Sequence, residues 1–265
     1  MAQTRSFWKN GVMGFFDEDN NSDYRTGVWA DCPMLAIEAD PSLAYVFMED
    51  FLDFEAITDA DPPTSASWTY TQGGNTNGGA AILAGAGGIL ELDCESTTQH
   101  EGLHAQLAVA PFLLAANKDL WYECRVKVDD TFDKCEFFAG ISKLDTTLMK
   151  NDGDLDTGSD YVGFGVETSL AGVTSFYICK DAAELSDSMG TTGTLPEDDW
   201  MRFGFHVDGT TGIHAFIDGV EQALTNVVYT GIPTTDALSP VFVCQTDGTN
   251  DPLLHIDWVR CVQLR

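Results

Sequence analysis

Three carboxylates at alternate positions form the most suggestive chemical pattern in this 265-residue sequence. Glu91, Asp93 and Glu95 alternate with Leu92 and Cys94. Alternate residues of a β-strand lie on one face of its sheet, so a strand here would place the three carboxylates together. Two carboxyl groups about 5–5.5 Å apart are what a retaining glycosidase requires. The spacing makes a glycosidase site one hypothesis and a polar strand face the other.

Two further groups of side chains are candidates for binding a metal ion. His206 and His214 become neighbours if their segments pair as a hairpin, which supplies half of a metal site without an obvious third ligand. The acidic segment 151–160 combines carboxylates with glycines, as calcium loops do. It lacks the spacing and the terminal glutamate of an EF-hand. We therefore expect no bound metal or other cofactor, with calcium at 151–160 as the alternative.

Aromatic side chains beside polar ones offer a site of a different kind. Sugar rings stack on exposed aromatic rings and form hydrogen bonds with neighbouring charged groups. Trp121 with Arg125, and the segment that carries Trp68 and Tyr70, are candidates for such a carbohydrate-binding site. The alternative is that these rings pack in the core or at its rim, as large aromatic residues commonly do.

Composition and charge exclude several classes of function. The chain carries 13 Lys and Arg against 42 Asp and Glu, a formal net charge of −29, so nucleic acid and anionic membranes would repel it. Nucleotide-binding glycine motifs and a nucleophile elbow are absent. The first residues lack the apolar stretch of a secretory signal, which predicts folding in a cytosol. The seven cysteines are odd in number and include no Cys-x-x-Cys pair, so we expect small core residues rather than a zinc site.

The elements that would position these residues are strands. Short apolar segments separated by Gly, Asp, Asn and Thr clusters recur from Phe51 onward. They predict an all-β antiparallel sandwich or jelly roll over residues 51–265, preceded by an irregular N-terminal arm over residues 1–50. A short helix within Met34–Met48 is compatible with the sequence. The expected strands are Ser67–Thr71, Ile89–Glu95, Gly102–Ala108, Leu120–Val128, Glu136–Ser142, Tyr161–Thr168, Ser175–Cys179, Trp200–Val207, Gly212–Asp218, Val241–Gln245 and Leu253–Gln263, with a further short strand between Gly73 and Gly88.

One hairpin can be predicted down to its register. The segments Trp200–Val207 and Gly212–Asp218 both alternate apolar and polar residues around a polar turn. One alignment places every apolar side chain on one face and the polar ones on the other, which favours that alignment. It pairs Val207 with Ile213, Phe205 with Ala215, Phe203 with Ile217, His206 with His214 and Arg202 with Asp218.

This hairpin, with its Trp200, Arg202 and Asp218-Gly219, resembles the late hairpin of concanavalin A-like (laminin-G-like) jelly rolls. The segments 87–93, 120–128 and 138–142 look like the same superfamily, and more narrowly like structural proteins of tailed bacteriophages that carry this domain. The resemblance covers residues 51–265. The Glu-x-Asp-x-Glu pattern is also similar to that of laminarinases and lichenases, and implies Glu91 as nucleophile and Glu95 as acid/base. Cys94 and the glycine-rich lead-in depart from that pattern, and the strand comes early in the chain.

The resemblance implies a non-enzymatic bacteriophage virion protein, most simply a decoration (cement) protein on the capsid exterior. It would be made in the cytoplasm of the bacterial host and bind the major capsid protein, with a homo-oligomer such as a trimer expected. A tail or fibre component, a lectin-like carbohydrate-binding module and a β-glucanase remain as alternatives, and a cell-surface glycan is a further candidate partner. The aromatic N-terminal arm is the candidate capsid contact, through Phe7, Trp8, Phe15, Phe16 and Trp29.

Overall fold

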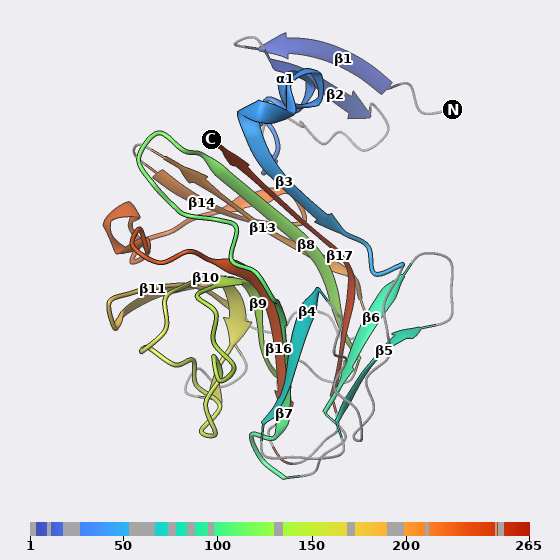
Figure 1. Cartoon of the computed structure of the whole chain (residues 1–265), viewed down its shortest axis with the longest axis vertical. Helices are drawn as coiled ribbons and strands as arrows, with labels where there is room; N and C mark the ends of the chain where they lie inside the picture. Colours follow the sequence, from blue (N-terminus) through green and yellow to red (C-terminus); the bar gives the residue numbers. More distant parts are fainter. Residues whose placement is uncertain are drawn as a thin grey trace.

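Two antiparallel β-sheets lie face to face and enclose the main apolar core (Figure 1). The computed structural model describes residues 4–9, 12–17, 27–52, 67–73, 78–83, 88–94, 98–129, 135–168, 173–189, 199–209, 212–246, 248 and 252–265. The all-β sandwich expected from the sequence is confirmed.

The seven-stranded sheet has the order β12-β11-β10-β9-β16-β7-β4. Its strands are β4 (Trp68–Gly73), β7 (Gly102–Leu107), β9 (Cys135–Ser142), β10 (Tyr161–Val166), β11 (Ser175–Lys180), β12 (Ala183–Ser188) and β16 (Ser239–Thr246). The opposite sheet follows the order β15-β14-β13-β8-β17-β6-β5, and β3 also pairs with β17. Its strands are β3 (Ala44–Glu49), β5 (Gly79–Leu83), β6 (Ile89–Asp93), β8 (Leu120–Asp129), β13 (Met201–Asp208), β14 (Gly212–Ile217), β15 (Val220–Gln222) and β17 (Leu253–Leu264).

Period-two alternation decides which side chains enter the core. Along β8 the side chains of Tyr122, Cys124 and Val126 join the main core, whereas those of the intervening residues lie on the outer face of the sheet. The hairpin of β13 and β14 has the predicted register, including the pair His206–His214. The requirement that all apolar side chains of both strands share one face was therefore sufficient to predict this register.

Strand β17 is the longest of the described strands, and it pairs with three others. It pairs with β8 along its length, with β6 in its first third, and with β3 in its second half. Its register with β8 shifts between Ile256 and Trp258, which makes Asp257 the extra residue of a β-bulge. A bulge bends the strand and redirects the side chains beside it.

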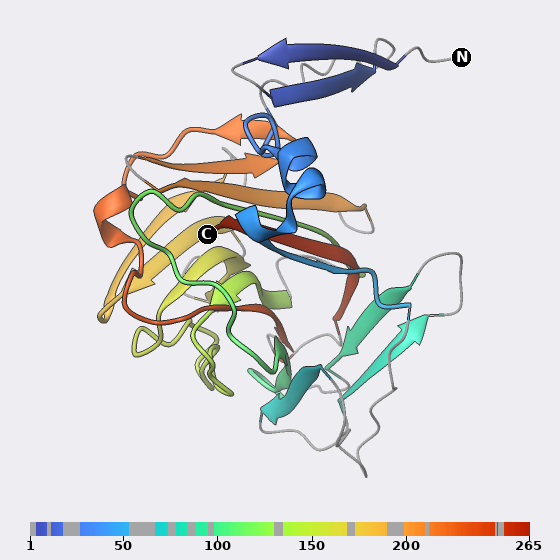
Figure 2. The same ribbon diagram turned by 45° about the horizontal axis from the view of Figure 1, so that its top comes forward.

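The described residues among 1–50 form two structurally different parts. Residues 27–50 belong to the sandwich, because helix α1 (Met34–Ala39) lies over the outer face of the eight-stranded sheet and β3 extends that sheet. The expected helix is therefore shorter than Met34–Met48, with a 3-10 turn at Pro41–Leu43 separating α1 from β3. Strands β1 (Thr4–Lys9) and β2 (Val12–Asp17) form a separate hairpin beyond α1 (Figure 2).

Within the described residues, the helices are too short to span a bilayer.

Candidate functional site

Trp121 does not offer the exposed ring that the carbohydrate hypothesis assigned to it. It lies on the outer face of β8, as expected, but only 1% of its surface is exposed. Residues around α1, including Val28 and Ile37, cover it, and its ring stacks on His206 with centroids 4.9 Å apart. The sequence placed Trp121 on the correct face, but could not show that another segment covers that face.

Trp68 and Tyr70 lie on the inner side of β4 and contribute to the rim of the core. Trp68 is buried and contacts Phe47 and Phe51. Tyr70 is half-buried, packs against the same core, and its burial raises the pKa of its hydroxyl. Neither residue presents a ring face to solvent in the manner that the predicted sugar site requires. Both residues instead pack in the core or at its rim, which was the alternative to the sugar site.

Arg125, the fourth residue of the predicted sugar site, is half-buried and lies beside two tryptophans that the sequence had not indicated as part of a sugar site. Its guanidinium lies 4.6 Å from the ring centroid of the half-buried Trp200 and 2.5 Å from the Asp257 carboxylate. The half-buried Trp258 is directly opposite Arg125 on β17. The bulge thus brings both Asp257 and Trp258 beside Arg125. We call Arg125, Trp200, Asp257 and Trp258 the outer-face cluster.

The candidate glycosidase pair is not assembled by the described residues. Glu91 lies on the outer face of β6, where its Oε2 is 2.8 Å from Nε2 of His255 on the neighbouring strand. Asp93 lies on the same face, and Glu95 falls outside the described residues. The His255 side chain that contacts the Glu91 carboxylate is buried, with only 4% of its surface exposed. Glu91 therefore contributes to an interaction between β6 and β17.

The acidic segment 151–160 forms turns that its own carboxylates stabilise. The Asp152 carboxylate accepts the Asp154 N–H, and the Asp156 carboxylate accepts the Gly158 N–H. Over the described parts of the chain, no group of three or more His, Cys, Asp or Glu side chains is arranged to hold a metal ion. His206 and His214 stack with centroids 5.9 Å apart, and each lies near a different carboxylate, Asp119 or Glu221.

The outer face of the seven-stranded sheet carries buried polar groups beneath residues 143–160. Burial raises the pKa of Glu167 to about 7, although its carboxylate accepts the Leu155 N–H at 2.7 Å. Burial likewise lowers the pKa of His104 to about 4. Both nitrogens of His104 and Oε1 of Gln245 line a cavity of about 50 Å³ without a hydrogen-bond partner among the described residues. A cavity of this size holds a few water molecules rather than a large ligand.

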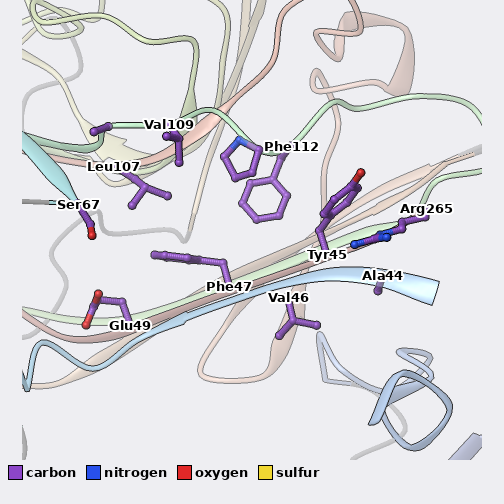
Figure 3. A pocket seen from close by; sticks show the side chains of 12 residues that line it. Ala44, Tyr45, Val46, Phe47, Glu49, Ser67, Leu107, Val109, Phe112 and Arg265 are labelled. Carbon is purple, nitrogen blue, oxygen red and sulfur yellow. The ribbon is translucent and has the colours of Figure 1, made fainter. Parts of the chain in front are cut away.

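An apolar groove lies between the two sheets at the edge formed by β3 (Figure 3). Its volume is about 620 Å³. The inward side chains of Tyr45 and Phe47 line one wall, and Leu107 and Phe112 line the other. At one end, the guanidinium of Arg265 lies 4.2 Å from the Tyr45 ring centroid. The groove is the open rim of the core, because β3 pairs only with β17 among the described strands.

Exposed apolar side chains gather around this groove. Seven of the eleven large hydrophobic residues that are exposed in the described structure come from two short segments at this edge. Val46 and Met48, on the outer side of β3, are each more than half exposed. A concentration of exposed apolar residues at one edge of a sheet marks an interaction site more often than scattered residues do. The seven residues are Leu43, Tyr45, Val46, Met48, Leu52, Val109 and Leu113.

The expected capsid contacts are only partly described. Trp29 is held on its own sheet, because its Nε1 donates to Glu123 at 2.6 Å and its ring lies under Arg260. For Phe7, Trp8, Phe15 and Phe16 the structure describes the backbone of the hairpin, in which Phe7 pairs with Gly14. Their side chains lie outside the description.

Comparison with known proteins identifies the fold. No family model and no curated protein matches the chain. Among solved structures, a protein of unknown function from Shewanella oneidensis MR-1 aligns with a TM-score of 0.56 and 16% identity, over 84% of this chain and 87% of that one.

Two neighbours have known activities. The Lotus tetragonolobus seed lectin aligns with a TM-score of 0.55 and 11% identity over 83% of this chain and 99% of the lectin. An endo-1,3-β-glucanase from Streptomyces sioyaensis aligns with a TM-score of 0.53 and 13% identity, over 84% of this chain and 98% of the glucanase. At these identities the similarity establishes the concanavalin A-like jelly roll, a fold that lectins and glycosidases share.

Proposed function

We propose that the chain is a non-catalytic structural protein of a tailed-bacteriophage virion, a decoration protein that docks on the outside of the capsid. The observation that carries the proposal is the apolar groove beside β3 with its surrounding exposed apolar residues. A strand edge flanked by apolar side chains suits the addition of a partner strand, in which main-chain hydrogen bonds give affinity and side-chain pockets give specificity. The partner we propose is the major capsid protein.

Charge and chemistry are consistent with this role. The net charge of −29 favours solubility for a protein displayed at high density and disfavours binding to DNA. The candidate nucleophile Glu91 is engaged by His255 in an interaction between β6 and β17. Many copies on one lattice would add avidity to a modest single contact, and a trimer on a threefold position of the shell would increase it further.

The first test is quantitative mass spectrometry of gradient-purified virions. Hundreds of copies per particle are expected for a lattice decoration protein. A few dozen copies would instead indicate a tail or fibre component. Absence from the particles would overturn the virion assignment.

The second test concerns the exposed apolar residues on the outer side of β3, beside the groove. The double substitution of Val46 and Met48 by Asp is expected to weaken binding to undecorated capsids by at least tenfold, because it places charge on an apolar contact surface. Val220→Asp is the matched control, since Val220 is also exposed but lies on β15 at the opposite edge of the same sheet. Equal binding of all variants in a capsid sedimentation assay would exclude this edge as the contact.

A second candidate function, carbohydrate binding, is favoured by the outer-face cluster. Trp200 and Trp258 supply half-buried rings, and Arg125 and Asp257 supply hydrogen-bonding groups beside them. We propose that a neutral saccharide stacks on this cluster, which lets a displayed protein hold the virion near a cell-surface glycan. A glycan array is the appropriate screen, with Trp200→Ala and Trp258→Ala expected to lose any signal.

The matched control for this second candidate is Tyr45→Ala, which removes another exposed aromatic ring that stacks on an arginine, in this case Arg265. Retention of binding by Tyr45→Ala and its loss in both tryptophan variants would support the cluster. An array without signal for the unmodified protein would dismiss it.

A further inference from the structure

Three thiols meet inside the core and connect the two sheets. The Cys244 Sγ on β16 lies 3.2 Å from the Cys94 Sγ and 3.5 Å from the Cys135 Sγ. Cys94 directly follows β6 of the eight-stranded sheet, whereas Cys135 and Cys244 lie on neighbouring strands of the seven-stranded sheet. All three are buried, and none of the seven cysteines forms a disulfide in this structure.

The geometry favours one pair over the other. Cys94 and Cys244 approach each other from facing sheets, and their sulfurs need to move together by only about 1.2 Å to reach the length of a disulfide bond. Cys135 is a diagonal neighbour of Cys244, because Cys244 is opposite Phe137 and Cys135 is opposite Thr246. Diagonal pairs have Cβ atoms about 7 Å apart, whereas a disulfide requires about 3.5–4.5 Å.

We propose that Cys94 and Cys244 are a disulfide-forming site that joins the two sheets covalently when the protein meets an oxidant. The oxidant is a small-molecule disulfide such as glutathione disulfide. The Cys244 thiolate attacks it, forms a mixed disulfide and releases one glutathione thiolate. The Cys94 thiolate then attacks the Cys244 sulfur and releases the second. Overall, two protein thiols are oxidised to one disulfide, and one glutathione disulfide is reduced to two glutathiones.

Burial determines when this reaction occurs. Sulfurs in a closed core are inaccessible to glutathione disulfide, so oxidation requires folding in an oxidising medium or transient opening of this end of the sandwich. The hydrogen bond with Cys135 and burial hold the pKa of the Cys244 thiol well above its usual value, so the closed protein reacts slowly. The chain thus folds with thiols in a reducing cytosol and acquires the bond outside it. This chemistry does not depend on the proposed capsid role.

The test is oxidative refolding followed by peptide mapping. The purified chain is unfolded, refolded in a glutathione redox buffer and digested without reduction. A Cys94–Cys244 linked peptide is the expected dominant product. The bond would span 150 residues, and we expect it to raise the Tm of the oxidised protein by about 10 °C over the reduced protein.

Variants distinguish this pair from the other thiols. Cys94→Ala is expected to abolish the link and the Tm difference, whereas Cys135→Ala is expected to retain both. Cys179→Ala is the matched control, because Cys179 is buried in the core cluster on the outer side of the seven-stranded sheet. Seven unmodified thiols after refolding, or random pairing among all cysteines, would overturn the proposal. A predominant Cys135–Cys244 link in the unmodified protein would also overturn it.

Discussion

Glu167 shows how one buried acid can make stability depend on pH. Its neighbours Glu184 and Asp154 add negative charge to the effect of burial, and its pKa rises to about 7 from a usual value near 4.5. The folded state therefore binds the proton more tightly than the unfolded state does. The stabilisation is complete below about pH 4.5 and is lost as the pH rises toward 7.

We therefore expect Glu167→Gln to flatten the pH dependence of stability. Glutamine retains an acceptor for the Leu155 N–H and carries no charge to bury. The free energy of unfolding of the variant, relative to the unmodified protein, should rise by up to about 3 kcal/mol between pH 4.5 and 7.5. Urea unfolding at several pH values measures this. A constant difference between the two proteins would show that Glu167 titrates normally.

Trp121 provides a prediction that separates core from surface tryptophans. Its ring is enclosed by the residues around α1, so Trp121→Ala should cost about 3–5 kcal/mol of unfolding free energy. Trp200→Ala, at a half-buried position, should cost clearly less. Denaturant titration monitored by circular dichroism compares the two. Similar losses would contradict the assignment of Trp121 to a covered face.

The pairing of the β13–β14 hairpin could be predicted from the sequence, whereas the pairing of β3 could not. The hairpin is local, and its complete alternation allows a single register. Strand β3 pairs with β17 about two hundred residues later, so no local pattern indicates its partner. Strand β12 has the sequence AELSDS, which lacks the β-branched and aromatic residues typical of strands.

The candidate sites were less predictable than the strands. Arg125 was identified, but its neighbours Asp257 and Trp258 depend on a bulge that alternation cannot indicate. Trp121 was misassigned because burial of an outer face depends on which distant segment covers it. The groove beside β3 could not be predicted for the same reason, since the residues of its two walls are more than about 60 positions apart in the chain.

Close approach of strands β7 and β16 predicts a strict requirement for glycine at position 102. A Cβ atom there would lie 2.0 Å from the Cys244 carbonyl oxygen, so the strands would have to separate. We expect Gly102→Ala to lower the free energy of unfolding by about 2–3 kcal/mol.

Gly27→Ala is the control for this substitution, because the nearest atom to an added Cβ there is 4.0 Å away. Thermal unfolding of both variants provides the measurement. An unchanged Tm for Gly102→Ala would mean that the two strands are not as close as described.

The whole molecule carries 42 acidic against 13 basic residues, so repulsion between carboxylates opposes folding. Salt screens this repulsion, with a Debye length of about 30 Å at 0.01 M and about 3 Å at 1 M. We therefore expect the Tm at neutral pH to rise by several degrees between about 10 mM and 0.5 M NaCl. Scanning calorimetry measures this shift, and a falling Tm would indicate that attractive ion pairs dominate.

The position of β17 also has a consequence for synthesis. The strand occupies residues 253–264, pairs with β8, β6 and β3, and lies at the middle of its sheet. Until it leaves the ribosome, β8 and β6 lack the strand that joins them. The strands made before β17 therefore have an incomplete sheet until β17 is synthesised, and pairings so distant in sequence form slowly. During this interval the nascent protein is most exposed to chaperones, proteases and its own neighbours on the polysome.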